Sequence, residues 1–271
     1  MIQPARPAPT SNPDPAHSQS LERGLAILSS FRSGRSLLGV SELARELGLG
    51  RSTTHRYVAT LARLGYLQQD EATRRYRLGL RVLDLGFSAL NSMELRDVAA
   101  PRLQELSDLT GRTVNMAILD GPDIVYIERC RSASAGQREI DLSLHVGSRL
   151  PAYCTSMGKV LIAHLSEDER GRVLGETEFA RRGPNTITSA STLERELVHI
   201  RRSGFALNDE ELAYGLRSIA MPVRAGGGRV VAALNLAAHR SMISLDDLVA
   251  RLSPALRQAA DEISARLGYR E

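Results

Sequence analysis

The chain has 271 residues, of which 42% are hydrophobic and 24% charged, and its formal net charge is +4. This balance is ordinary for a folded protein, and the length allows one large domain or two modest ones. No apolar run approaches the roughly 18 residues of a membrane span, the N-terminus has no signal-peptide core, and the two cysteines, Cys130 and Cys154, are too few for a disulfide scaffold. We therefore expect a cytoplasmic protein that does not bind a membrane.

The positive charge is concentrated near the N-terminus. Residues 19–81 hold eleven arginines and five acidic residues, a net charge of +6, whereas residues 82–271 carry a net charge of −2. A basic module on a mildly acidic body indicates a polyanion as partner, although an arginine-rich composition can also spread charge unevenly by chance. Residues 1–18 are rich in proline and poor in large apolar side chains, and we expect them to form a disordered tail.

Three short helices are predicted in the basic module. Leu21, Leu25, Leu28 and Phe31 recur at helical spacing and predict a helix over 20–31 that buries this stripe. The next two helices are predicted over 40–48, with Ser41 as N-cap and Gly48 at the end, and over 51–64, with Gly65 after it. Two short helices joined by a tight turn, the second polar and basic at its start, match a helix-turn-helix.

A predicted hairpin over 66–78 follows the third helix and carries arginines on its second arm. A hairpin in this place is a wing, so we expect a winged helix. Polar and basic side chains at the start of the third helix can reach base edges in a major groove, and the later arginines suit phosphate contacts. The candidate DNA-binding residues are Ser41, Arg51, Ser52, Thr53, Thr54, Arg56, Tyr57, Arg63, Arg74, Arg75 and Arg77. A protein-binding winged helix is the alternative, which the clustered charge disfavours.

An amphipathic connector is predicted next, because Leu80, Leu83, Phe87 and Leu90 recur at helical spacing up to about residue 91. An apolar stripe between two domains suits a dimer contact, and packing onto the C-terminal domain is the alternative. The predicted division is a tail over 1–18, a winged helix-turn-helix DNA-binding domain over 19–80, a linker and dimerisation helix over 81–94, and a C-terminal domain over 95–271.

The C-terminal region mixes helix and strand patterns. The elements predicted in chain order are a helix over 95–110, strands over 113–119, 124–131 and 140–146, helices over 157–165, from 166 and over 191–204, strands over 216–224 and 229–237, and a helix over 245–267. Ser166 and Ser191 each precede a glutamate by three residues, as in a capping box, and Pro254 predicts a kink in the last helix. Meandering antiparallel strands with helices between them indicate an α+β fold.

The hairpin over 216–237 has one bulky apolar face and one face of small residues. Residues such as Ile219 and Leu234 alternate with small ones, among which Ser218 and Asn235 are isolated polar groups. A face of small residues with a few polar groups suits a small-molecule pocket. The alternative is a face covered by a close-packed helix, with the two polar groups bonded locally, and the pattern alone does not separate the two.

No catalytic set is assembled in the sequence. The stretch from Ser156 to Lys159 has the S-x-x-K spacing of serine β-lactamases, but their K-T-G segment is impossible in a chain with a single lysine. Cys154 has no identifiable histidine partner, and the six histidines show no metal-ligand spacing. The acidic stretch 208–211 is expected to be a solvated loop, and a cation site is the alternative. We predict no enzyme activity, metal or cofactor, and keep a hydrolase that uses Ser156 or Cys154 as the alternative.

Several stretches resemble the IclR family of bacterial transcriptional regulators. They are Ser20–Leu28, Ser41–Ala44, Arg51–Arg56, Leu61–Leu67, Gly147–Pro151, Gly158–Leu161, Asn208–Glu211 and Gly215–Ala220. The resemblance covers about residues 19–268 and implies a winged-helix domain, a linker helix and a GAF-like effector-binding domain with an antiparallel sheet, assembled as a homodimer or homotetramer. Residues 149–158 resemble the subgroup that controls protocatechuate, 4-hydroxybenzoate and β-ketoadipate catabolism.

The resemblance implies a ligand-responsive regulator that binds a double-stranded DNA operator and a small organic acid, aromatic or dicarboxylic. The family's effector pocket corresponds to Leu142, Ser156, Met157, Asn208, Ser218, Asn235 and Ala237. Some relatives have other residues at 208, 218 and 235, so the identity of their effectors does not carry over. Tyr126 and Tyr153 are candidate walls for an aromatic ring. His145 or Arg149 is a candidate partner for its carboxylate, and a structural ion pair is the alternative for Arg149.

Overall fold

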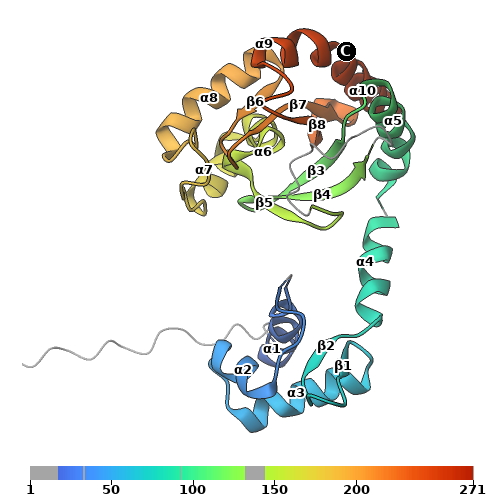
Figure 1. The fold of residues 1–271 in the computed structure, drawn as a ribbon, viewed down its shortest axis with the longest axis vertical. Helices are drawn as coiled ribbons and strands as arrows, with labels where there is room; N and C mark the ends of the chain where they lie inside the picture. Colours follow the sequence, from blue (N-terminus) through green and yellow to red (C-terminus); the bar gives the residue numbers. More distant parts are fainter. Residues whose placement is uncertain (1–17, 33, 92, 132–143, 271) are drawn as a thin grey trace, which may run out of the picture. The chain divides into compact units, whose positions relative to one another are not determined.

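The structure is a computed structural model that describes residues 18–32, 34–91, 93–131 and 144–270 (Figure 1). The chain divides into two compact units, one ending at Ala89 and one beginning at Leu90. Residues 1–17 of the predicted tail lie outside the described residues, and Ser18 is the N-cap of the first helix. Within the described ranges, no helix has the length and apolar character needed to cross a membrane.

The N-terminal unit is a three-helix core with a two-stranded antiparallel hairpin. Its elements are α1 (Gln19–Ser29), α2 (Val40–Glu46), α3 (Arg51–Arg63), β1 (Leu67–Gln69) and β2 (Tyr76–Leu78), followed by α4 (Arg81–Asn91). The core residues are Ile27, Phe31, Leu38, Leu43, Val58, Leu67 and Tyr76. Leu38 pairs with Tyr76, which attaches the hairpin to the segment before α2. The predicted winged helix is confirmed.

Two predicted details of this unit are wrong. Leu21 and Leu25 are 63% and 55% exposed, because α1 packs through the neighbouring face that carries Ile27 instead. The N-cap of α2 is Gly39 rather than Ser41: the backbone N–H of Gly39 donates to Oε2 of Glu42 at 2.7 Å, so the carboxylate in the first turn supplies the cap.

The C-terminal unit is built on one six-stranded antiparallel sheet in the order β5-β4-β3-β8-β7-β6. The strands are β3 (Val114–Asp120), β4 (Asp123–Cys130), β5 (Arg149–Pro151), β6 (Ala206–Asp209), β7 (Leu216–Arg224) and β8 (Val230–His239). The hairpin of β7 and β8 and the helix ends at Gly111 and Gly204 agree with the prediction, and both glycines have the positive φ of a left-handed cap.

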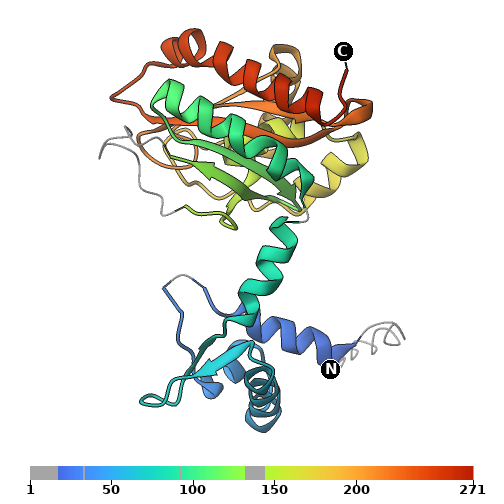
Figure 2. The ribbon, with the colours of Figure 1, turned by 90° about the vertical axis from the view of Figure 1, so that its right-hand side faces the viewer.

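Helices cover both faces of this sheet. One face packs against η1 (Ala152–Cys154), α6 (Ser156–Ala163), α7 (Glu167–Gly175) and α8 (Ala190–Ser203), and the other against α5 (Glu94–Thr110), α9 (Leu245–Asp247), the π-helical turn η3 (Leu248–Leu252) and α10 (Ser253–Arg266). Figure 2 shows α5 and α10 side by side over their face. The interruption predicted near Pro254 is the π-helical turn just before α10. The α+β fold is therefore confirmed.

Four expectations for this unit need correction. Residues 144–146 form no strand, and residues 140–143 lie outside the described residues. β5 and β6 were not predicted, because each is a short edge strand of three or four residues. The helix expected from Ser191 begins at Ala190, with Ser189 as its N-cap. The acidic stretch 208–211 is not a solvated loop, since Asn208, Glu210 and Glu211 are buried.

Candidate DNA interface and effector site

The first turns of α3 present polar and basic side chains at the surface. Arg51, Ser52 and Arg56 are exposed and Thr53 is half-buried. α3 starts directly after Gly50, and no side chain among the described residues caps its N-terminus. The first backbone N–H groups of the helix and the adjacent arginines together form a positive end, which is suited to phosphate and base contacts.

Thr54 is the predicted DNA-binding residue that the structure contradicts. Its side chain is fully buried, and its hydroxyl donates to the carbonyl of Gly50 at 3.1 Å. Thr54 lies one turn before the core residue Val58, so it belongs to the buried stripe of α3. Tyr57 is half-buried, and its hydroxyl donates to Oγ of Ser20 at 3.3 Å, which joins α3 to α1.

The wing carries three exposed arginines in different settings. Arg74 lies in the hairpin turn with φ 58°. Nη2 of Arg75 lies 2.7 Å from Oε1 of Glu42, which joins the wing to α2, and Nε of Arg77 donates to Gln68 at 3.2 Å on the opposite strand. The remaining candidates, Arg63 at the end of α3 and Ser41 on α2, are exposed.

The small-residue face of the sheet brings four predicted effector residues together beneath α6. Oγ of Ser156, on the first turn of α6, lies 2.7 Å from Oγ of Ser218 on β7. Nδ2 of Asn208 on β6 donates to the carbonyl of Cys154 at 2.6 Å. Oδ1 of Asn235 on β8 accepts from Asn115 at 2.8 Å. All four side chains are buried, so a cluster of hydroxyl and amide groups lies inside an apolar layer.

Most of the other predicted effector residues lie in or beside this apolar layer. Tyr126, Tyr153 and Met157 are buried there, Ala237 on β8 is half-buried, and Leu142 lies outside the described residues. The hydroxyl of Tyr153 donates to the carbonyl of Ala180 at 2.5 Å. Burial raises the pKa of Tyr126 to about 12, so its phenol stays neutral.

The two residues suggested as carboxylate partners are engaged with other groups. Nη2 of Arg149 lies 2.7 Å from the carboxylate of Asp120, and Nε of Arg149 lies 3.5 Å from the carboxylate of Asp123. These contacts correspond to the structural ion pair that was the alternative for Arg149. The hydrogen bond to Asp120 and the two negative charges raise the pKa of Arg149. Nδ1 of His145 lies 3.0 Å from Oγ of Ser148.

The acidic stretch after β6 is joined to the sheet and to α6 by ion pairs, of which the pair of Lys159 with Glu211 is buried on both sides. Nζ of Lys159 lies 2.5 Å from Oε1 of Glu211 and 3.5 Å from that of Glu196 on α8. Nη1 of Arg240 lies 2.6 Å from Oε1 of Glu210. The pair of Lys159 with Glu211 holds α6 against the end of β6, the two elements that carry Ser156 and Asn208, and the pair of Arg240 with Glu210 joins the same stretch to the end of β8.

Cys154 is not suited to nucleophilic chemistry. Its side chain is fully buried, and burial raises the pKa of its thiol to about 12, so the reactive thiolate is disfavoured. Among the described residues, no group of three histidine, cysteine or carboxylate side chains is placed to hold a metal ion.

Asn115 and Arg129 were missed by the sequence reasoning. They lie opposite each other on β3 and β4, and Nη1 of Arg129 donates to Oδ1 of Asn115 at 2.8 Å. Strand alternation places Asn115 on the face of Ala117, a residue of the α6 side of the sheet. Strand periodicity could have suggested Asn115, but the partner of Asn115 depends on a bulge in β4 that leaves no recognisable sequence signal.

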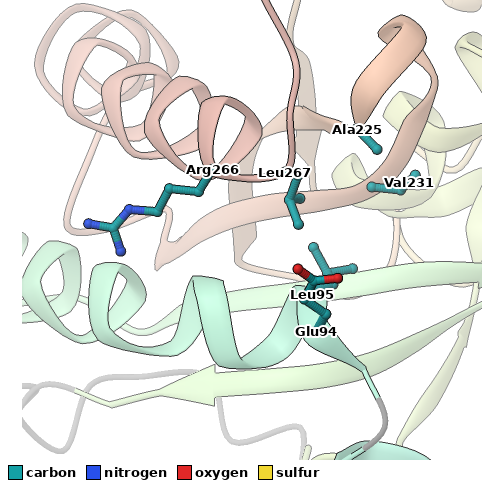
Figure 3. Close-up of a pocket in the computed structure, with 6 residues that line it drawn as sticks. All are labelled: Glu94, Leu95, Ala225, Val231, Arg266 and Leu267. Carbon is teal, nitrogen blue, oxygen red and sulfur yellow. The ribbon is translucent and has the colours of Figure 1, made fainter.

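A separate cavity of about 300 Å³ lies on the opposite side of the sheet (Figure 3). It is lined by Glu94, Leu95, Ala225, Val231, Arg266 and Leu267, from α5, the turn between β7 and β8, the start of β8, and the end of α10. None of the predicted effector residues contributes to it. The predicted site and this cavity are therefore distinct.

Comparison with known proteins decides the family. Residues 20–71 match the IclR helix-turn-helix domain, and residues 87–265 match the C-terminal domain of bacterial IclR transcriptional regulators. The chain belongs to the IclR family. It is therefore a DNA-binding transcriptional regulator and not an enzyme, which removes the hydrolase alternative.

Individual IclR relatives align along almost the whole chain. The Pca regulon regulatory protein of Pseudomonas putida is 36% identical and covers 94% of this chain and 86% of its own length. The regulator XynR of Escherichia coli is 37% identical, covering 93% and 98%. Among solved structures, a transcriptional regulator from a Rhodococcus species has a TM-score of 0.79 at 38% identity, covering 93% and 99%. An IclR homologue from Microbacterium hydrocarbonoxydans, solved with 4-hydroxybenzoate, has a TM-score of 0.78 at 27% identity, covering 92% and 99%.

Proposed function

We propose that this regulator responds to an aromatic or dicarboxylic acid and controls an operon for aromatic-acid catabolism of the protocatechuate or β-ketoadipate type. The observation that carries the proposal is the similarity to the Pca regulon regulatory protein over 94% of the chain. The 4-hydroxybenzoate bound to the Microbacterium homologue supports the same class of ligand.

The effector site of the proposal is the small-residue face beneath α6. Its buried hydroxyls and amides can hydrogen-bond the polar groups of a small acid, and the alanines and tyrosines around them can pack against a ring. A buried polar cluster also makes a site selective, because a ligand that leaves these groups unpaired pays for their desolvation.

In the proposed DNA complex, α3 lies in the major groove. Arg51, Ser52, Thr53 and Arg56 are the proposed base readers, while Arg63 and the wing arginines contact phosphates. Phosphate contacts release counterions, so affinity must fall steeply with salt. A salt-independent complex with a protein partner is the outcome expected of a protein-binding winged helix instead.

The proposed assembly is a homodimer or homotetramer. Of the predicted stripe of Leu80, Leu83, Phe87 and Leu90 on or next to α4, the first three are more than half exposed in the single chain and Leu90 is half-buried. Burying such a row against a second copy is favourable, and a dimer would present two recognition helices to a two-fold operator. We retain the division into domains 19–80, 81–94 and 95–271 as part of this proposal. We also propose that the protein is cytoplasmic, because operator DNA lies in the cytoplasm.

Control by the effector requires that the acid bind one arrangement of the assembly more tightly than the other. A thermal-shift panel of 4-hydroxybenzoate, protocatechuate, β-ketoadipate and unrelated sugars tests the ligand class. We expect at least one of the three acids to raise the melting temperature and the sugars to have no effect. A panel in which only non-acidic compounds stabilise the protein contradicts the proposal.

A further inference from the structure

A row of polar side chains crosses the small-residue face from β8 to β4. The strands β8, β3 and β4 are adjacent in the sheet (Figure 1). On them, Asn235 lies opposite Asn115, and Asn115 lies opposite Arg129. Nδ2 of Asn115 donates to Oδ1 of Asn235, and Oδ1 of Asn115 accepts from Nη1 of Arg129, each at 2.8 Å. Asn115 is buried and uses both ends of its amide, so it fixes the orientation of both neighbours.

A β-bulge places the arginine in this row. The pairing of β3 with β4 shifts between Met116 and Ala117, so that Asn115 lies opposite Arg129. Without the shift, Asn115 would lie opposite Glu128. In the structure Glu128 instead pairs with Arg96 of α5, its Oε2 2.8 Å from Nε of Arg96. The bulge thus brings a cation to this face and leaves the carboxylate to the α5 side.

Arg129 lies at the end of the row that α6 covers least. α6 packs chiefly on β7 and β8 and touches β4 at few positions. Tyr126 lies three residues before Arg129 on β4 and on the same face, because the bulge falls between them: Tyr126 is opposite Ala117, and Arg129 is opposite Asn115. The row therefore joins the buried amide of Asn235 to a half-buried cation beside an aromatic side chain.

We propose that Arg129 binds the carboxylate of the effector and that Asn115 is a positioning residue that holds its guanidinium. This inference rests on the proposed function, which makes the small-residue face the effector site. A guanidinium carries five N–H donors in a planar fork, so it can hold Asn115 and a carboxylate at once. Arg149 pairs with Asp120 and Asp123, and His145 contacts the hydroxyl of Ser148, so neither is the residue to which we assign the effector carboxylate.

The test compares an acid with its uncharged analogue in isothermal titration calorimetry, using 4-hydroxybenzoate and 4-hydroxybenzamide. Wild-type protein should prefer the acid. Arg129→Gln should weaken binding of the acid by roughly 10- to 100-fold and remove the preference, because a charged hydrogen bond is lost. Arg102→Gln is the matched control, because Arg102 pairs with Glu105 and Glu262 on the α5 and α10 side of the sheet, and it should bind both compounds as wild type does. Asn115→Ala should weaken binding of 4-hydroxybenzoate more than it weakens binding of 4-hydroxybenzamide, so the preference for the acid should fall.

The outcomes separate this inference from the proposed function. Acid binding by Arg129→Gln equal to that of the wild type, or a wild type without preference for the acid, overturns the role of Arg129 and leaves an aromatic effector in place. A wild type that binds neither compound nor any other carboxylate of the panel overturns both. If Arg129→Gln fails to fold, Arg129→Lys keeps the charge without the planar fork and should retain the preference for the acid at reduced affinity.

Discussion

Replacing Lys159 with methionine should destabilise the C-terminal unit strongly. The side chains of Lys159 and Glu211 are only 2% and 9% exposed, and Nζ lies 2.5 Å from Oε1. The second carboxylate oxygen, Oε2 of Glu211, is buried with no hydrogen-bond partner among the described residues. Removing one partner of a buried pair leaves an uncompensated charge, at a cost of about 3–5 kcal/mol. For a unit of this size each kcal/mol corresponds to about 2–4 °C in melting temperature.

Urea and thermal unfolding, followed by circular dichroism, measure this cost. The double variant Lys159→Met with Glu211→Gln should regain most of the lost free energy of unfolding, because neither residue then carries a buried charge. Arg251→Met is the control, since its pair with Asp247 is exposed and should contribute less than about 1 kcal/mol. A loss in Lys159→Met no larger than in this control would contradict an uncompensated buried charge on Glu211, as would a double variant at least as unstable as Lys159→Met.

The same pair predicts a pH dependence with a definite sign. Burial raises the pKa of Glu211, and the charge of Lys159 opposes that rise only in part. The folded protein therefore binds the proton of the Glu211 carboxyl more tightly than the unfolded chain does. The contribution of this proton to the free energy of unfolding is complete below the ordinary pKa of glutamate and is lost as pH rises through the raised pKa. Lys159→Met removes the opposing positive charge and therefore raises the pKa of Glu211 further. Its deficit in unfolding free energy relative to wild type should grow from pH 5 to pH 8.

Three further changes test the interfaces, each with a thermal melt to confirm folding. Arg56→Ala should lower affinity for a selected operator by roughly 5- to 100-fold in fluorescence anisotropy, because an arginine contact to a base is lost, and wild-type affinity would exclude Arg56 as a reader. Phe87→Glu should reduce the mass seen by light scattering, since it places a charge in the apolar row of α4, and an unchanged mass would contradict that row as the contact. Ser218→Leu should abolish calorimetric binding of 4-hydroxybenzoate by placing a bulky apolar side chain where the hydroxyl of Ser218 now contacts Ser156, whereas unaltered binding would place the effector elsewhere.

Local signals predicted much of the fold. The start of α3 at Arg51, the left-handed glycine after α5 and the hairpin of β7 and β8 depend on neighbouring residues only, so their sequence carries the information. The position of Ser218 on a small-residue face followed from strand alternation for the same reason.

Long-range contacts account for what sequence reasoning missed. The stretch after β6 reads as a solvated loop because its charges dominate, but its partners Lys159 and Arg240 come from distant parts of the chain and make burial possible. The partner of Asn115 likewise depends on a one-residue shift in β4. Thr54 was assigned to DNA because threonine is polar, while its hydroxyl is satisfied within the helix by Gly50.

An organic acid should change the affinity of this protein for DNA. The most direct measurement is the anisotropy of a labelled operator, selected by the protein from random sequence, titrated with and without saturating 4-hydroxybenzoate or protocatechuate. At least one acid should shift the operator Kd by roughly five-fold or more, and operator DNA should shift the affinity for that acid by the same factor. Operator affinity that is identical with and without every acid that binds the protein would contradict this coupling.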